Sequence, residues 1–164
     1  IKKRMIDYTI QQSNIFEDDK VVFTSEHEAL YISALDIYQD NFFFGIGPKM
    51  FRIYCEYPEY KKRFGCSTHP HNTYIQLLVE TGIIGFIFFL SIFLFITYKF
   101  LVHLYYSFFL KKVFLSDYQV FLLIAVYLTL WPLSPSSNFF SSGISIIYYF
   151  PIGFLLNSFY KELK

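Results

Sequence analysis

The chain has 164 residues, and only 16% of them are charged, well below the roughly 25% of soluble proteins. With 54% hydrophobic residues and a net charge of +1, the composition excludes a strongly basic nucleic-acid-binding protein. The charges are also unevenly placed, because nine of the 14 Lys and Arg residues and ten of the 13 Asp and Glu residues precede Gly65. A polar half followed by an apolar half indicates a membrane protein.

The first predicted element is a helix in the polar half. The S-E-H-E stretch at 25–28 has the S-x-x-E pattern of a capping box. Behind it, an apolar face at helical spacing is formed by Tyr31, Ala34, Leu35 and Tyr38. We therefore predict a helix over about residues 26–40.

The rest of the polar half is predicted to be mostly irregular. The NFFFGIGPKMFR stretch at 41–52 has two glycines and a proline, which interrupt regular structure, and four phenylalanines, which favour burial. Its G-I-G-P-K part lacks the pattern of a phosphate-binding loop and is interpreted as a turn. A second, short helix is predicted to begin near Asn72, a good N-cap residue, and to end near Glu80.

The apolar half is long enough for three membrane crossings. A helix needs roughly 20 apolar residues to cross ~30 Å of hydrocarbon, and residues 81–102 meet this requirement. Residues 118–160 then hold 43 positions without Asp, Glu, Lys or Arg, with prolines and serines in the middle that favour a turn. The predicted spans are 81–102, 117–134 and 142–159, which makes the fold class an all-α polytopic membrane protein.

The basic residues predict the orientation of these spans. Three lysines precede the second span, Lys99 at the end of the first span and Lys111 and Lys112 after it, and two more lie in the tail. Both segments are therefore expected on the cytoplasmic side. Residues 1–80 and the 134–142 turn then lie on the opposite side, which is the periplasm in a bacterium with an inner and an outer membrane. Since the chain begins with isoleucine and has no signal-peptide pattern, we expect the C-terminal fragment of a longer inner-membrane protein, with a partly helical periplasmic loop at 1–80 and a membrane region at 81–164.

Two cysteines and two histidines in the loop allow two interpretations. Cys55, Cys66, His69 and His71 are four potential zinc ligands, but their spacing fits no common zinc pattern. Because the periplasm oxidises thiols, a disulfide between Cys55 and Cys66 is favoured, and no metal site is predicted. Such a disulfide would stabilise the loop by ~3 kcal/mol.

His71 and two arginines are the candidate functional residues. His71 precedes the expected N-terminus of the short helix, whose N–H groups and dipole attract anions. Its ordinary pKa of ~6.5 allows a neutral imidazole to accept a proton, so both a catalytic base and a surface histidine at a helix cap are possible. Arg4 and Arg52 carry guanidinium groups that can bind a phosphate through two hydrogen bonds. Glu80 is interpreted as an interfacial charge, with a second acid–base group as the alternative.

Two sequence blocks resemble those of a known family. From His71 to Gly85 the chain has the pattern H-N-x9-G-x-x-G, which is similar to the signature of the O-antigen ligase and O-antigen polymerase superfamily. Upstream, SALDIYQDNFFFGIGPKMFR at 33–52 resembles the N-P-L-F-G-V-G-P-G-N-F block of that family. The resemblance covers about residues 25–100 in motifs and the remainder in topology.

This resemblance implies a metal-independent, inverting membrane glycosyltransferase that needs no cofactor. The donor would be an undecaprenyl-diphosphate-linked glycan in the lipid bilayer, and the acceptor would be another glycan or lipid A–core; no nucleic acid is implied. His71 takes the position of the family's catalytic histidine, and the adjoining Asn72 is assigned to substrate binding. Arg52 and Arg4 are candidates for holding the diphosphate, and His27 stands where many members carry the arginine of an S-G-R sequence.

A non-catalytic role is the alternative prediction. A membrane scaffold or a flippase partner in surface polysaccharide assembly would use the same loop for binding alone. Since the missing spans would form most of the lipid-binding groove, we expect this fragment to be inactive by itself.

Overall fold

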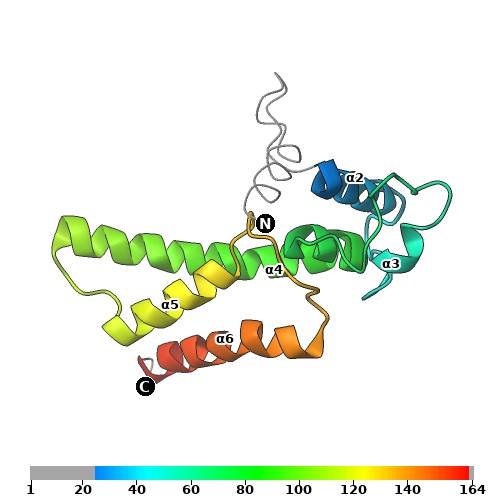
Figure 1. Cartoon of the computed structure of the whole chain (residues 1–164). Coiled ribbons are helices and arrows are strands. Elements are labelled where there is room, and N and C mark those ends of the chain that lie inside the picture. The colour runs from blue at the N-terminus through cyan, green and yellow to red at the C-terminus, as the bar shows by residue number, and fades with distance from the viewer. Residues whose placement is uncertain (1–24, 163–164) are drawn as a thin grey trace, which may run out of the picture.

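The computed structural model describes residues 25–162, so the expectations for Arg4 lie outside the described residues. Within this part the chain is all-helical and contains no strand, as predicted. The elements are α2 (Ser25–Asp40), α3 (Phe51–Tyr54), α4 (Thr73–Tyr105), a π-helical turn (Tyr106–Leu110), α5 (Asp117–Thr129) and α6 (Ser142–Glu162). Figure 1 shows α2 and α3 near one end of the molecule and the connection between α4 and α5 at the other.

Helix α2 agrees with its predicted range, and its buried face overlaps the predicted one. Leu30, Ala34 and Ile37 are buried against Val79 of α4 and Phe51 of α3. Of the predicted face, Ala34 is buried and Tyr31 and Tyr38 pack against the same cluster, whereas Leu35 is 40% exposed. Both sets have helical spacing, and only the packing partner decides between them. The side chain of Ser25, the predicted cap, lies outside the described residues.

Helix α4 consists of two helical segments, 73–81 and 83–105, joined at Gly82 with φ 66° and ψ −170°. The ring centroid of Tyr74 lies 5.3 Å from that of Phe89 and 6.1 Å from that of Phe93. Along a straight helix these residues would be roughly 22 and 28 Å apart. The short segment therefore folds back along the long one, and the break falls at the end of the predicted short helix.

The segment that follows α2 satisfies the backbone groups exposed at this break. A continuous helix would pair the Val79 and Glu80 carbonyls with N–H groups four residues later. Instead, three backbone hydrogen bonds join the break to residues 41–47: Ile46 N donates to Val79 O (3.1 Å), Gly47 N to Glu80 O (2.9 Å) and Ile83 N to Phe42 O (2.9 Å). These three bonds replace the missing helical partners of the Val79 and Glu80 carbonyls and of the Ile83 N–H group.

Two glycines permit this close approach of the two backbones. A Cβ atom added to Gly82 would lie 2.3 Å from the Phe43 carbonyl oxygen, and one added to Gly45 would lie 2.5 Å from the carbonyl carbon of Glu80. Both glycines also have positive φ, 66° and 67°, where a side chain is strained. The absence of a side chain at Gly82 therefore admits the 41–47 segment to the break.

The apolar half forms a bundle of the long segment of α4 with α5 and α6. Its core includes Phe89 and Ile96 of α4, Leu123 and Val126 of α5, and Leu155 of α6. Within residues 25–162, one helix, Thr73–Leu110, is long and apolar enough to cross a membrane. Its straight 83–105 segment is about 35 Å long, against ~30 Å for the hydrocarbon core. The 13 residues of α5 extend only about 20 Å, so the predicted span 117–134 continues into non-helical chain.

Candidate active site

Three histidines from two parts of the chain form a cluster. The ring centroid of His71 lies 4.2 Å from that of His69 and 5.9 Å from that of His27. His27 belongs to the first turn of α2, whereas the other two belong to the loop before α4. The structure therefore brings together two predicted site residues, His27 and His71, that are 44 positions apart in the sequence.

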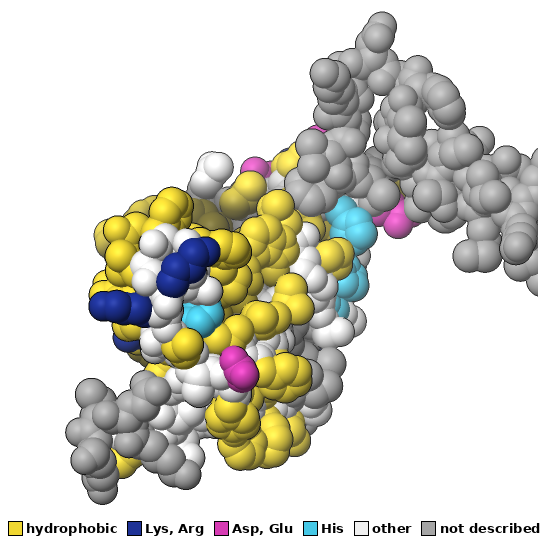
Figure 2. Space-filling model, turned by 90° about the vertical axis from the view of Figure 1, so that its left-hand side faces the viewer, with side chains coloured by type: hydrophobic (Ala, Val, Ile, Leu, Met, Phe, Trp, Pro, Cys, Tyr) yellow, Lys and Arg dark blue, Asp and Glu magenta, His cyan; other side chains and the backbone are white. Residues whose placement is uncertain are grey.

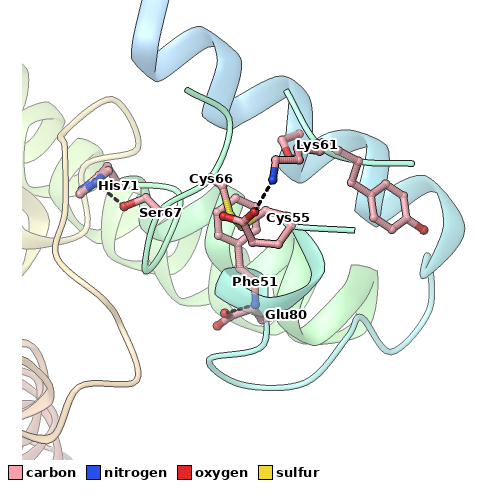
Figure 3. The surroundings of a disulfide bond; sticks show 10 residues. Phe51, Cys55, Lys61, Cys66, Ser67, His71 and Glu80 are labelled. Atoms are coloured by element: carbon pink, nitrogen blue, oxygen red, sulfur yellow. Dashed lines mark hydrogen bonds and ion pairs between the residues drawn. A yellow bond between two sulfur atoms is a disulfide. The ribbon is translucent and has the colours of Figure 1, made fainter. Parts of the chain in front are cut away.

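His71 is held in an unusual backbone conformation with its ring partly shielded. Its φ is 57°, a left-handed value uncommon for a residue with a side chain. Ser67 Oγ lies 3.3 Å from its Nε2 atom, a pair drawn in Figure 3. Burial lowers the pKa of His71 from its ordinary value of 6.5, and the neighbouring His69 and His27 lower it further. The ring is therefore neutral, and able to accept a proton, at neutral pH.

His69 has a structural position in this cluster. It is 8% exposed, with Nε2 3.2 Å from the Ser136 carbonyl oxygen and Nδ1 2.9 Å from Thr68 Oγ1. Because a carbonyl only accepts hydrogen bonds, Nε2 carries a proton, and Nδ1 pairs with the Thr68 hydroxyl. Both ring nitrogens are thus engaged, which leaves His71 as the candidate base.

Asn72 is the N-cap of α4, as its position in the sequence predicts. Its Oδ1 atom accepts from the backbone N–H of Tyr74 (2.9 Å) and of Ile75 (3.1 Å). Its Nδ2 atom donates to the Pro132 carbonyl at 2.8 Å. The cap therefore occupies two of the N–H groups that were expected to attract an anion at this helix N-terminus.

Substitutions of Asn72 should separate the contribution of its cap oxygen from that of its hydrogen bond to Pro132. Asn72→Ala removes the cap and the bond to Pro132, and we expect it to lower the free energy of unfolding by about 1 to 2 kcal/mol. Asn72→Asp keeps the cap oxygen and loses only the donor, so its loss should be smaller. Denaturant unfolding monitored by circular dichroism measures both. Equal losses in the two variants would contradict the role of the cap.

The connection between α5 and α6 is also part of the site. Ser136 N donates to the His71 carbonyl (2.9 Å), Thr73 Oγ1 donates to Ser136 Oγ (2.8 Å), and the Tyr74 hydroxyl donates to the Leu130 carbonyl (2.6 Å). The sequence indicated only a proline- and serine-containing turn here. No pattern in these serines and prolines indicates which residues they contact, so the sequence did not predict the contact between this connection and the histidine loop.

Glu80 lies in a buried network, and its interpretation as an interfacial charge was wrong. The residue is 1% exposed, and its carboxylate accepts from Phe51 N at 3.2 Å (Figure 3) and from Gln76 Nε2 at 2.9 Å. Gln76 in turn accepts from Phe139 N at 2.9 Å. This network joins α3, the short segment of α4 and the connection between α5 and α6. These hydrogen bonds pair the buried carboxylate, and the alternative interpretation of Glu80 as a second acid–base group stays a prediction.

Cys55 and Cys66 form a disulfide between α3 and the histidine loop, with their Cα atoms 5.2 Å apart. Cys55 is fully buried, and Figure 3 shows the bond between Phe51 and the loop that leads to His71. Among residues 25–162, no group of three or more His, Cys, Asp or Glu residues is arranged to hold a metal ion. The disulfide bond therefore attaches the histidine loop to the buried cluster that contains Cys55 and Phe51.

The predicted arginines are not gathered around His71 in the described part of the chain. Arg52 follows the buried Phe51 on α3 and is itself exposed, and no contact between its side chain and the three histidines is recorded among residues 25–162. Arg4 lies outside the described residues. The role assigned to both arginines stays a prediction.

The long apolar helix, together with a polar site at the start of α4, defines a membrane protein with a candidate catalytic histidine. A model of the family described as O-antigen ligase matches residues 8–90, about half of the chain. The chain therefore belongs to the O-antigen ligase family. No curated protein and no solved structure matches the chain.

Proposed function

We propose that the chain carries the catalytic histidine of a membrane glycosyltransferase of the O-antigen ligase or polymerase type. It would transfer or polymerise glycans linked to undecaprenyl diphosphate on the periplasmic side of the inner membrane. Family membership supports glycan transfer. The observation that carries the proposal is the neutral His71 ring, with its lowered pKa, next to the capped N-terminus of α4.

In the proposed reaction His71 is a general base. The acceptor is a sugar hydroxyl, whose pKa is far above 7, so a base must take its proton as the new bond forms. His71 would accept this proton while the acceptor oxygen bonds to the anomeric carbon and the bond from that carbon to the diphosphate breaks. Ser67, at 3.3 Å from Nε2, orients the ring. The product would have inverted configuration and the lipid diphosphate would leave.

Positive charge is needed on the diphosphate side of this reaction. Arg52 is exposed on α3 and can turn toward a ligand, and Arg4 is the second candidate. A guanidinium group binds a phosphate with two parallel hydrogen bonds and stabilises charge that develops on the leaving group. His27, beside His71, would contribute charge only when it is protonated.

The proposed topology has three spans near 81–102, 117–134 and 142–159 and a cytoplasmic C-terminus. The separation of the two ends of the molecule supports it, because α2 lies away from the connection between α4 and α5 (Figure 1). Lys111 and Lys112 are exposed in that connection, and Figure 2 shows Lys and Arg side chains gathered at this end of the molecule. Excess Lys and Arg mark the cytoplasmic side of a membrane protein.

Complementation tests the proposed function and distinguishes its two forms. The full-length protein, expressed in cells that lack an O-antigen ligase or in cells that lack a polymerase, should restore one glycan product. Restored attachment to lipid A–core identifies a ligase, and restored long glycan chains identify a polymerase. Purified protein that binds lipid-linked glycan but turns over none in either assay would instead support the scaffold.

A further inference from the structure

An apolar groove runs between α4 and α6, away from the histidine site. Its volume is about 300 Å³, and its lining is almost entirely hydrophobic. The main lining side chains are Ile92, Phe95 and Ile96 of α4 and Leu155, Leu156 and Phe159 of α6. A hydrocarbon chain is the ligand that gains most from such a surface.

A lysine stands at one end of this groove. Lys99 Nζ lies 5.6 Å from the ring centroid of Phe95 and 5.5 Å from that of Phe159, and both rings line the groove. A third ring, that of Phe114, lies 5.7 Å away. Among residues 25–162 the structure records no carboxylate or other hydrogen-bond acceptor for this ammonium group. Its N–H donors therefore remain available for an anion beside an apolar surface.

The positions of the groove and of Lys99 suit a lipid that lies along α4 and α6. The groove residues of α4 precede Lys99 by up to two turns, about 12 Å along the helix axis, toward the middle of the long segment. Lys99 precedes the connection between α4 and α5, where Lys111 and Lys112 are exposed and where Figure 2 shows Lys and Arg side chains. Such a basic end lies at the headgroup level of a membrane. An anionic head at Lys99 would thus place its chain in the groove.

We propose that this groove binds one acyl chain of an anionic phospholipid and that Lys99 pairs with the phosphate of its headgroup. The inference rests on the proposed placement of α4 and α6 in the bilayer, but it does not involve His71 or the glycan reaction. A lipid held in this way would fill the space between two helices that meet only partly, and would join them at their charged end.

Lipid retention by the full-length protein tests the proposal. The protein is reconstituted in nanodiscs with equal parts of phosphatidylglycerol and phosphatidylcholine, washed in detergent, and its retained lipid is measured by mass spectrometry. We expect the wild type to retain phosphatidylglycerol preferentially. Lys99→Gln should reduce this preference about fivefold, the effect of one lysine near an anionic surface, and Lys99→Arg should keep it. Lys112→Gln removes the same charge from the exposed connection and should leave the preference unchanged.

A second variant tests the groove itself. Ser91 lines the groove beyond Ile92, so Ser91→Trp should reduce retention while Lys99 is intact. The proposal would be overturned if Lys99→Gln and Lys112→Gln reduced retention equally. It would also be overturned if the wild type retained no lipid, as expected when another helix or protein covers the groove. Alkaline carbonate extraction reports membrane insertion separately. A protein that stays in the membrane pellet but retains no lipid overturns this inference and leaves the proposed function standing.

Discussion

Replacing His71 with alanine is expected to lower glycan transfer by about 100-fold or more, because a general base contributes typically 10²–10⁴ to the rate. The His71 side chain is partly exposed on the loop. The backbone hydrogen bond from Ser136 N to the His71 carbonyl oxygen does not require the imidazole ring. The variant should therefore remain folded and in the membrane. Product formation from lipid-linked glycan, measured with purified full-length protein, checks the expected loss.

His103 provides a matched control for this substitution. Its Nδ1 atom accepts from Leu115 N at 3.3 Å near the connection between α4 and α5, remote in the fold from the histidine cluster. His103→Ala should leave transfer within a few-fold of the wild type. If His71→Ala retained wild-type transfer, or if both variants lost it equally, His71 would not be the base.

The pH dependence of the wild type provides a second measure of the same role. The pKa of His71 is lowered below 6.5 by burial and by the two neighbouring histidines, so transfer should persist below pH 6.5 and fall only as the ring becomes protonated. Between the lowered pKa and 6.5 the folded state binds fewer protons at this residue than the unfolded state. Stability should therefore be complete above pH 6.5 and decrease as the pH falls through this window, and His71→Ala should remove that contribution.

Gly82→Ala is expected to be the most destabilising single substitution in the fold. The new Cβ atom would lie 2.3 Å from the Phe43 carbonyl oxygen, and the backbone at this position has φ 66°. With ψ −170° this is a conformation that essentially only glycine adopts, and its strain alone costs a residue with a side chain about 1 to 3 kcal/mol. The overlap with a backbone atom adds to this cost. We expect a loss of at least about 3 kcal/mol, which a thermal or denaturant melt of the full-length protein would record.

Gly153→Ala is the control for this change. Gly153 lies within α6, and a Cβ atom added there meets nothing within 4 Å. Alanine in a helix interior is favoured over glycine by up to about 1 kcal/mol, so this variant should be as stable as the wild type or more so. A Gly82→Ala protein that melts with the wild type would show that the two segments of α4 do not turn back at this residue.

Much of the local structure could be predicted from the sequence. The limits of α2, the irregular 41–52 segment and the cap at Asn72 follow from short-range patterns, because caps, turns and helical periodicity act over a few residues. The same holds for the position of the break in α4, since two different periodic segments meet there. The membrane character follows from the long uncharged runs.

The long-range contacts could not be predicted in this way. Nothing in the sequence places Tyr74 beside Phe93, His27 beside His71, or Ser136 on the histidine loop. Each of these contacts depends on the turn at Gly82, whose direction is set by a segment some 40 residues earlier. The burial of Glu80 was not predicted for the same reason, because Phe51 of α3, which donates to its carboxylate, lies 29 positions earlier in the sequence.

The fold-back of α4 gives the spacing of the H-N-x9-G-x-x-G pattern a physical meaning. The residues between Asn72 and Gly82 fix how far the helix returns before it meets the α5–α6 connection, and each adds about 1.5 Å of length and 100° of rotation. One residue more or fewer would turn His71 away from His27 and Ser67, even if every side chain of the site were kept. The pattern therefore specifies a length and a phase as well as a set of residues, and an insertion in this segment would be less tolerable than most substitutions within it.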